Sequence, residues 1–275
     1  MKILVTGSDG MIGMELIELL KDKGDSIHIV DFKRGNDLRN FNECLSYTKG
    51  IDIVYHLAGI KGNPKMTSEK PVDFMGPMLQ FDTNMIVAAQ TNGVKKFLYT
   101  SSIAVENPST DRFPAHAKMT AEILIDAMRV QYPKGTEYCI VRPANCYGRF
   151  DNFNKENLMV ISDLIKKGIE NDELHIWGDG SQIRDFINAK DVARGMILAM
   201  KKMPKKPVNL CSGEGVTIKE VGKIIANKVN KPILFEGGNK GADKRVMKLN
   251  WDFKPIIPIK DGIEEVIEWK LKNQS

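Results

Sequence analysis

Three glycines, Gly7, Gly10 and Gly13, follow an apolar segment at the N-terminus and precede an amphipathic one. Glycine at the first position permits a tight turn, and at the second it lets the backbone approach a ligand. At the third it lets the helix pack closely on the strand. The exposed amide groups and the positive end of a helix dipole at such a turn stabilise a diphosphate. The chemistry indicated by these residues is binding of a dinucleotide.

A carboxylate stands where such a turn requires one for a ribose. Asp31 ends the second apolar segment, residues 27–30, at the distance from the glycines that dinucleotide-binding proteins show. Its two oxygens can accept hydrogen bonds from a 2′,3′-diol, which favours NAD as the cofactor. Lys33 and Arg34 follow directly and offer charge for a 2′-phosphate, so NADP is the alternative.

A parallel sheet would bring these residues together. Apolar segments that alternate with amphipathic ones predict an α/β fold, a doubly wound parallel sheet of the Rossmann type. The carboxyl ends of its strands meet at one edge, so we expect Gly7, Asp31, Ala58 and Ser102 to converge there. The predicted strands span residues 2–6, 27–30, 51–58, 96–102 and 138–141. The predicted helices run from about residue 12 to a cap at Gly24, from 82 to 93 and from 115 to 130.

Beyond Pro143 the pattern becomes less regular and the polar connections lengthen. We predict a dinucleotide-binding domain in residues 1–150 and a smaller, mainly substrate-binding domain in residues 151–275. Residues 183–210 are expected to return to the first sheet. The elements predicted here are a loop at 145–157, helices at 158–168, 191–201 (with Asp191 as N-cap), 218–229 and 262–271, and strands at 174–177 and 208–211.

The composition is that of a soluble globular protein. The chain has 275 residues, of which 42% are hydrophobic and 27% charged, and a net charge of +5. Its lysines are dispersed, and no interleaving of aromatic and basic residues indicates nucleic-acid binding. No apolar run is long enough for a membrane span and no signal-peptide pattern is present, so we expect a cytoplasmic protein. The four cysteines and four histidines show no metal-ligand spacing, which predicts reduced thiols and no metal site.

Six ordered segments carry a resemblance that extends along the chain. The sequence resembles the extended short-chain dehydrogenase/reductases that act on nucleotide sugars, the NAD-dependent epimerase/dehydratase group. Within that group, residues 145–153 look most like GDP-L-fucose synthases. The matching segments are TGSDGMIG from Thr6, VYHLAG from Val54, GVKKFLYTSS from Gly93, RPANCYGRFDNFN from Arg142, HIWGDGSQIRDF from His175 and VNLCSGEGVTIKE from Val208.

The resemblance implies two catalytic residues and exposes one departure. Ser102 matches the serine that hydrogen-bonds the reacting sugar oxygen, and Lys118 matches the lysine that holds the nicotinamide ribose. The tyrosine that exchanges the proton in these enzymes is replaced by Pro114, which has no proton to exchange. Loss of a general acid or base commonly costs about 10² to 10⁴ in rate. The remaining candidates for this role are water, His116, Tyr147 and Asp111.

Two further positions argue against GDP-L-fucose synthesis itself. Ala104 stands at the catalytic cysteine of those synthases, and Met159 aligns with their histidine. The segment between Ser102 and Lys118 is also shorter than in those enzymes. Two functions therefore remain open: a hydride-transferring enzyme with a degenerate acid/base site, or a redox-inactive protein that binds NAD or a nucleotide sugar.

The resemblance and the glycine turn together predict the ligand contacts and the assembly. The predicted substrate is a nucleoside-diphosphate sugar. The predicted assembly is a homodimer that forms through the helices near residues 82–93 and 115–130. The predicted substrate contacts are Ser102, Asn145, Arg184 and Arg245. The predicted cofactor contacts are Gly7, Asp9, Gly10, Met11, Ile12, Asp31, Asp37, Leu38, Leu57, Ala58, Gly59, Lys118 and Pro143.

Overall fold

A computed structural model describes residues 1–21, 24–60, 62, 64–108, 112–153, 158–237 and 243–273. Its largest sheet has six strands in the order β10-β5-β4-β3-β1-β2, and all neighbouring pairs are parallel. The doubly wound parallel sheet predicted from the sequence is confirmed. The strands are β1 (Lys2–Thr6), β2 (Ser26–Val30), β3 (Ile53–His56), β4 (Lys96–Thr100), β5 (Glu137–Pro143) and β10 (Val208–Leu210).

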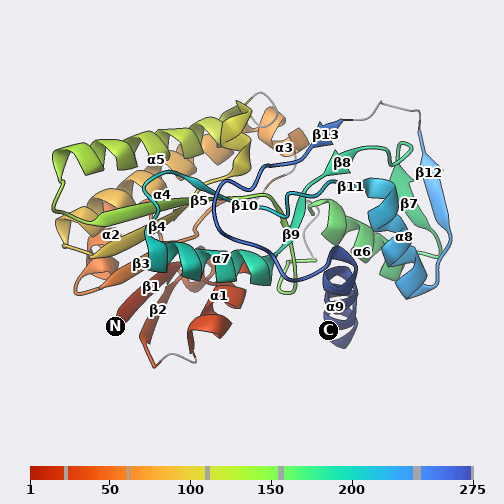
Figure 1. Ribbon diagram of the computed structural model, residues 1–275, viewed down its shortest axis with the longest axis horizontal. Coiled ribbons are helices and arrows are strands. Elements are labelled where there is room, and N and C mark those ends of the chain that lie inside the picture. The colour runs from red at the N-terminus through yellow and green to blue at the C-terminus, as the bar shows by residue number, and fades with distance from the viewer. Residues whose placement is uncertain are drawn as a thin grey trace.

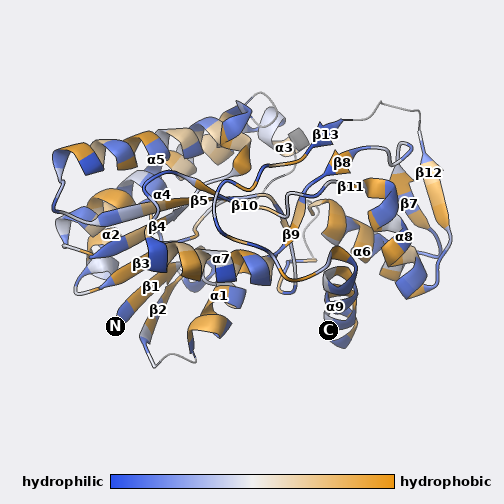
Figure 2. Cartoon of the chain, in the orientation of Figure 1, coloured by the Kyte–Doolittle hydropathy of each residue, from blue (hydrophilic) through white to orange (hydrophobic). Residues whose placement is uncertain are grey.

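Helices cover both faces of this sheet, which explains why its inner strands are apolar on both sides. Two helices, α1 (Met11–Lys21) and α7 (Ala189–Lys202), share one core with the sheet. On the other face lie α2 (Phe41–Thr48), α4 (Pro71–Thr91) and α5 (Arg112–Gln131), which share a second core with it (Figure 1). The strands appear as apolar ribbons between helices whose hydrophilic residues face outward (Figure 2). None of the helices in the described part of the chain is long and apolar enough to span a membrane.

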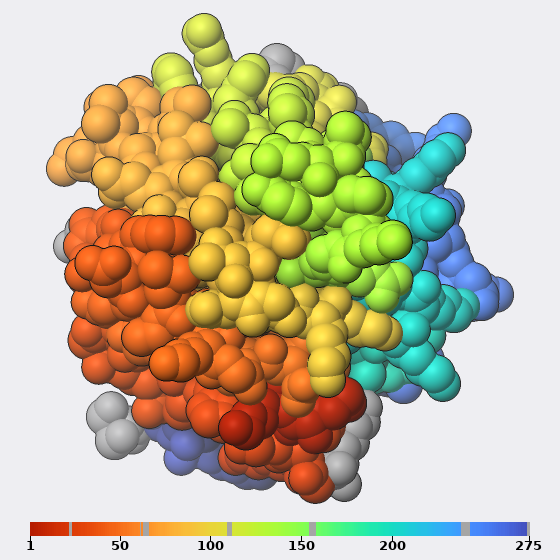
Figure 3. All heavy atoms as spheres, turned by 90° about the vertical axis from the view of Figure 1, so that its left-hand side faces the viewer, coloured from red at the N-terminus to blue at the C-terminus, as the bar shows by residue number. Residues whose placement is uncertain are grey.

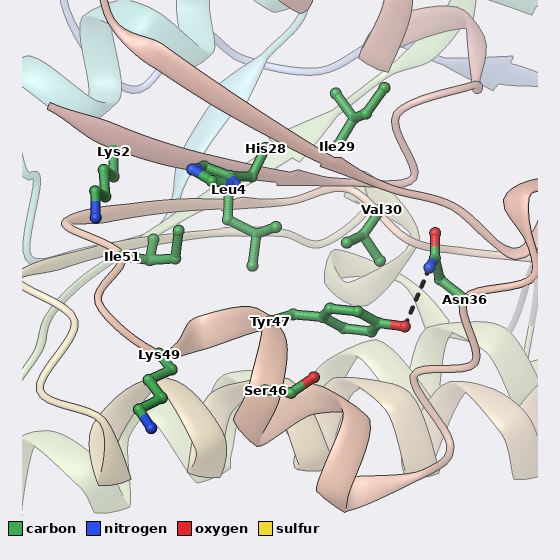
Figure 4. Close-up of a pocket in the computed structure, with 10 residues that line it drawn as sticks. All are labelled: Lys2, Leu4, His28, Ile29, Val30, Asn36, Ser46, Tyr47, Lys49 and Ile51. Atoms are coloured by element: carbon green, nitrogen blue, oxygen red, sulfur yellow. Dashed lines mark hydrogen bonds between the residues drawn. The ribbon is translucent and has the colours of Figure 1, made fainter.

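The sheet ends at β2, one strand earlier than in the common doubly wound arrangement. In a doubly wound sheet with strand order 3-2-1-4-5-6, a third strand follows the second and pairs with it. Here residues 31–52 form η1 (Phe32–Arg34) and α2, with no strand between them. A hollow of about 340 Å³ lies where β1 and β2 face α2 (Figure 4). Its lining includes Leu4, His28 and Val30 from the strands and Ser46, Tyr47 and Lys49 from the helix side.

The second half of the chain builds a separate core beside the carboxyl ends of the strands (Figure 1). Three helices surround it, α6 (Val160–Glu170), α8 (Ile218–Val229) and α9 (Ile259–Lys272). The short strands here are β6 (Asn145–Tyr147), β7 (Leu174–Trp177), β8 (Ile183–Arg184), β9 (Phe186–Asn188), β11 (Val216–Thr217), β12 (Ile233–Glu236) and β13 (Lys244–Arg245). Figure 3 shows the opposite end of the molecule, where the first 140 residues form most of the surface and residues near 200 close one side. The domain boundary at residue 150 stays a prediction.

Several predicted elements differ from those observed. The helix predicted from residue 82 begins eleven residues earlier, at Pro71, which suits the first helical position because that amide needs no partner. The loop predicted at 145–157 contains β6, and its residues 154–157 lie outside the described part. The prediction of Asp191 as N-cap is wrong. Asn188 caps α7 by accepting from the Lys190 amide, while Asp191 is buried and accepts from the amides of Ile256 and Ile257.

Two other predictions remain as they were. Gly24 has φ +69°, the left-handed conformation of a helix-ending glycine, but residues 22 and 23 before it lie outside the described part. The homodimer through α4 and α5 stays a prediction. Both helices carry exposed apolar side chains, including Val72, Ile123 and Val130.

The glycine turn allows a direct test of its packing. A Cβ atom at Gly13 would lie 2.3 Å from the carbonyl oxygen of Gly7, whereas at Gly76, also helical, it would meet nothing within 4 Å. We expect Gly13→Ala to lower the free energy of unfolding by about 1–3 kcal/mol or more, because backbone must move. Gly76→Ala should raise it by roughly 0.5–1 kcal/mol. Urea unfolding of both variants measures the difference, and equal midpoints would contradict this account.

Candidate functional site

The glycine turn follows β1 and packs against the residues at the end of the neighbouring strand β3. Gly7 has φ +66°, and a Cβ atom there would lie 2.8 Å from the backbone of Leu57 and of Ala58. The Leu57 amide donates to the Thr6 carbonyl at 3.1 Å, and the Ala58 amide donates to the Thr6 hydroxyl at 3.3 Å. The residues predicted to meet at the carboxyl edge, Gly7 and Ala58, are therefore in contact.

Asp31, which directly follows β2, also contacts the turn. One of its carboxylate oxygens accepts from the Asp9 amide in the turn at 2.9 Å, and the other accepts from the Lys33 amide at 2.9 Å. The neighbouring cations also reach the turn. Lys33 Nζ donates to the Asp9 carbonyl at 2.8 Å, and Arg34 Nε donates to the Asp9 carboxylate at 2.9 Å. Backbone amides, an acid and two cations thus surround one turn.

The other predicted cofactor contacts occupy the same edge of the sheet. Two of them, Leu38 and Asp37, are already engaged within the protein. Met11 and Ile12 open α1 after Gly10, Gly59 is exposed after β3, and Pro143 is buried at the end of β5. Leu38 is only 7% exposed, so most of its side chain belongs to the core. The Asp37 carboxylate is held by Arg39 in a bidentate pair, and these hydrogen bonds lower its pKa.

Ser102 and Lys118 lie on adjacent elements at this edge. Ser102 precedes η2 (Ile103–Glu106) and caps it, because its hydroxyl accepts from the Ala104 amide at 3.2 Å. Lys118 stands one turn after Pro114 on α5 and is buried. Pro114 lies in the first turn of this helix, where backbone amides need no intrahelical partner, so the proline leaves the helix intact. The fold accommodates the loss of the tyrosine.

Lys118 Nζ contacts a carboxylate that the sequence did not indicate. It lies 3.3 Å from Asp82 Oδ2 and 4.8 Å from the centroid of the Tyr99 ring. The Tyr99 hydroxyl donates to Asp82 Oδ2 at 2.6 Å, and His56 Nε2 lies 3.0 Å from Oδ1. Burial alone raises the pKa of Asp82, but Lys118, His56 and Tyr99 outweigh burial and the pKa is lowered. Asp82 is therefore an ionised acid with three donors.

Two of the alternative proton carriers lie away from Ser102 and Lys118, and the third is not described. His116 is exposed, and its Nδ1 lies 2.5 Å from the Arg112 carbonyl oxygen. Tyr147 is 2% exposed in the core of the second half, and burial raises its pKa. Asp111 lies outside the described residues. Neither described residue is placed to replace the missing tyrosine.

Three of the four predicted substrate contacts, Asn145, Arg184 and Arg245, lie in the second half of the chain, whereas Ser102 lies in the first. Asn145 and Arg184 line a hollow of about 40 Å³, together with Cys146, Met159, Val160, Ile161, Ser162 and Phe186. Asn145 Nδ2 donates to the Asp185 carbonyl at 2.8 Å. Arg184 and Arg245 meet at one acid, because their guanidinium groups lie 2.9 Å and 2.8 Å from Asp243 Oδ2. Burial lowers the pKa of Arg184.

Sequence reasoning missed three of these residues. Asp82 carried a usable signal, since it is an acid on a helix face formed by Met78, Met85 and Ile86. Cys146 and Asp243 carried no such signal, because Arg184, which lies beside both, comes from a distant part of the chain.

Comparisons with known proteins agree with this geometry. The sequence model described as the NAD dependent epimerase/dehydratase family matches residues 3–211. Putative GDP-L-fucose synthase 2 of Arabidopsis thaliana is 29% identical over 306 aligned positions, which cover 99% of this chain and 92% of the plant protein. GDP-L-colitose synthase of Yersinia pseudotuberculosis is 30% identical over 252 positions, which cover 82% of this chain and 81% of that protein. The resemblance predicted from the six segments is confirmed.

Solved structures share the fold along the whole chain. UDP-glucose 4-epimerase of Thermotoga maritima, solved with UDP-glucose, has a TM-score of 0.87 at 21% identity and covers 100% of both chains. A GDP-L-fucose synthetase of Naegleria fowleri, solved with NADP, has a TM-score of 0.81 at 23% identity and covers 99% of this chain and 93% of that one. At these identities the likeness shows the fold alone.

The cysteines provide a test of the hollow beside Arg184. Burial raises the pKa of Cys44, Cys139 and Cys211 to about 12, whereas Cys146 is partly exposed in this hollow. Because the thiolate is the reactive species, we expect iodoacetamide near neutral pH to modify one thiol rapidly. Intact-protein mass spectrometry should show that Cys146→Ser removes the fast reaction and Cys211→Ser does not. Rapid reaction at a second cysteine would contradict the described burial.

Proposed function

Because this chain belongs to the NAD-dependent epimerase/dehydratase family, we propose that it binds NAD at the turn from Gly7 to Gly13 and a nucleoside-diphosphate sugar beside Arg184, with hydride transfer between them. The observation that carries the proposal is the contact among the turn, Ala58 and Asp31 at the carboxyl edge of the sheet. Ligands of doubly wound sheets bind at this edge.

The residues present fit a dinucleotide. A Cβ atom at Gly10 would crowd the Gly7 carbonyl oxygen at 3.2 Å, so this turn stays bare of side chains where a diphosphate would approach. The amides at the start of α1 and its dipole would stabilise the diphosphate. Asp31, already against the turn, would accept hydrogen bonds from the adenosine ribose.

Residues of the chain account for part of the reaction. A nicotinamide cofactor held at this edge would supply hydride-transfer chemistry. Ser102 would donate to or accept from the reacting sugar oxygen, and Lys118 would place a cation beside the cofactor. Pro114 leaves no tyrosine to exchange the proton, so water takes that part in our proposal. Turnover is expected to be slower by about 10² to 10⁴ than with a positioned acid or base.

The arginines support a diphosphate substrate. Arg184 and Arg245 converge on the Asp243 carboxylate, which shows that their guanidinium groups can contact one anionic group together. A diphosphate offers more oxygens of the same charge, and arginine binds such groups through paired hydrogen bonds. Asn145, in the same hollow as Arg184, would contribute a further polar contact.

A second function is favoured by Pro114. A protein that binds the same cofactor and nucleotide sugar without hydride transfer needs every contact described above but no proton carrier. The fold leaves that position without a hydroxyl and holds Lys118 against Asp82. Fold alone does not decide between the two functions.

One experiment separates these functions. Purified protein is assayed for bound NAD(H) and NADP(H), then incubated with GDP-, UDP- and dTDP-sugars while nicotinamide absorbance and epimerised product are followed. Cofactor binding with turnover supports the enzyme, binding without turnover supports the second function, and absence of binding contradicts both. Arg184→Met should weaken binding of the active sugar about 10-fold or more. Arg129→Met, which breaks an arginine–aspartate pair on α5, is the matched control.

Cofactor choice is tested at Asp31. A carboxylate favours a ribose diol and repels a 2′-phosphate, and Lys33 and Arg34 are already engaged by Asp9. The wild type should bind NADH more tightly than NADPH, and Asp31→Asn should weaken NADH binding by about 10-fold while improving NADPH binding. Fluorescence titration measures both, with Asp25→Asn at the other end of β2 as the control. A wild-type preference for NADPH would overturn the choice of NAD.

A further inference from the structure

The most deeply buried charge cluster in the described part of the chain lies beneath the proposed cofactor site. Asp82 is 1% exposed and His56 is not exposed at all, while the Lys118 side chain is 10% exposed. The carboxylate from α4 accepts from His56 on β3, Tyr99 on β4 and Lys118 on α5. Four elements thus meet at one acid.

The protonation of this cluster follows from its contacts. Burial lowers the pKa of His56, so the ring is neutral. We assign its proton to Nε2, which then donates to Asp82, and leave Nδ1 to accept from the Thr6 hydroxyl at 2.7 Å. The Tyr99 hydroxyl stays protonated, because burial and Asp82 raise its pKa. Among the residues that the structure describes, the one cation that touches the Asp82 carboxylate is therefore Lys118.

Glu122 is another acid near this cluster, and it is occupied elsewhere. It follows Lys118 by one turn of α5 and accepts from Ser101, directly after β4, and from Arg142 on β5. Its charge is balanced by Arg142. Within the described part of the chain, Asp82 is therefore the charge partner of Lys118.

We propose that Asp82 is a positioning residue for the cofactor site, whose carboxylate holds the ammonium group of Lys118 in place. This inference rests on the proposed function, because it assigns Lys118 to the cofactor. A buried ammonium group that loses its carboxylate is left unpaired, and the side chain then has no ionic partner that fixes its position. The cation that faces the cofactor therefore depends on a side chain beneath it.

Asp82→Asn removes the charge and keeps the shape. We expect NADH to bind about 10-fold more weakly to this variant, because the Lys118 side chain loses the group that positions it. Tyr99→Phe, which keeps the ring and the ion pair, should bind NADH with nearly the affinity of the wild type. Fluorescence titration with NADH measures each constant, and thermal unfolding confirms that each variant is folded.

The outcomes separate the inference from the proposed function. A wild type that binds neither NADH nor NADPH contradicts the proposed function. A wild type that binds NADH, beside a folded Asp82→Asn variant that binds it with the same affinity, overturns the role of Asp82 alone.

A second comparison applies where Asp82→Asn does not fold. Removing both charges in Asp82→Asn/Lys118→Met avoids a stranded buried ion and is expected to restore folding. If Asp82 acts through Lys118, the double variant binds NADH as Lys118→Met does. An additional loss of affinity in the double variant, or its failure to fold while Lys118→Met folds, would overturn the inference.

Discussion

The ionised carboxylate of Asp82 constrains the arrangement of the whole N-terminal half. Taking a carboxylate out of water costs several kcal/mol, which only well-placed donors offset. Those donors come from β3, β4 and α5, while Asp82 itself lies on α4. The four elements therefore cannot shift relative to one another without leaving the charge poorly paired. His56 extends the constraint to β1, because it accepts from Thr6 directly before the glycine turn.

The two regions that we assign to ligands differ in how firmly their charges are held. Beneath the glycine turn, the ion pair is closed off from solvent and has almost no exposed surface. In the second half, Asp243 is 46% exposed while it contacts Arg184 and Arg245. Exposed pairs of this kind contribute little to stability, so an anionic ligand can replace the carboxylate at low cost. The proposed cofactor region is thus organised without a ligand, whereas in the proposed sugar site the arginines would have to exchange Asp243 for the ligand.

Features that depend on residues close together in the chain could be predicted from the sequence. Glycine spacing, apolar runs and the acid at Asp31 predicted the strands, the turn and the sheet edge. The burial of Asp82 on a helix face could be predicted in this way, but its partners could not. These partners lie 26, 17 and 36 residues from Asp82, and only the packing of α4 and α5 on the sheet brings them together. Asp191 shows the same limit, since the sequence predicts it as a helix cap but its carboxylate accepts from the amides of Ile256 and Ile257, 65 and 66 positions away.

The buried cluster also changes the interpretation of Lys118 and Pro114. We predict Lys118 as the catalytic lysine of the family, and in this chain it also pairs with the buried carboxylate of Asp82. Removing it would leave that carboxylate without a cation, which costs stability whether or not hydride is transferred. Pro114 shows the opposite case. It removes the proton carrier at no structural cost, because the first turn of α5 needs no amide there. Stability alone therefore explains the lysine and tolerates the proline, and only a measurement of turnover bears on the reaction.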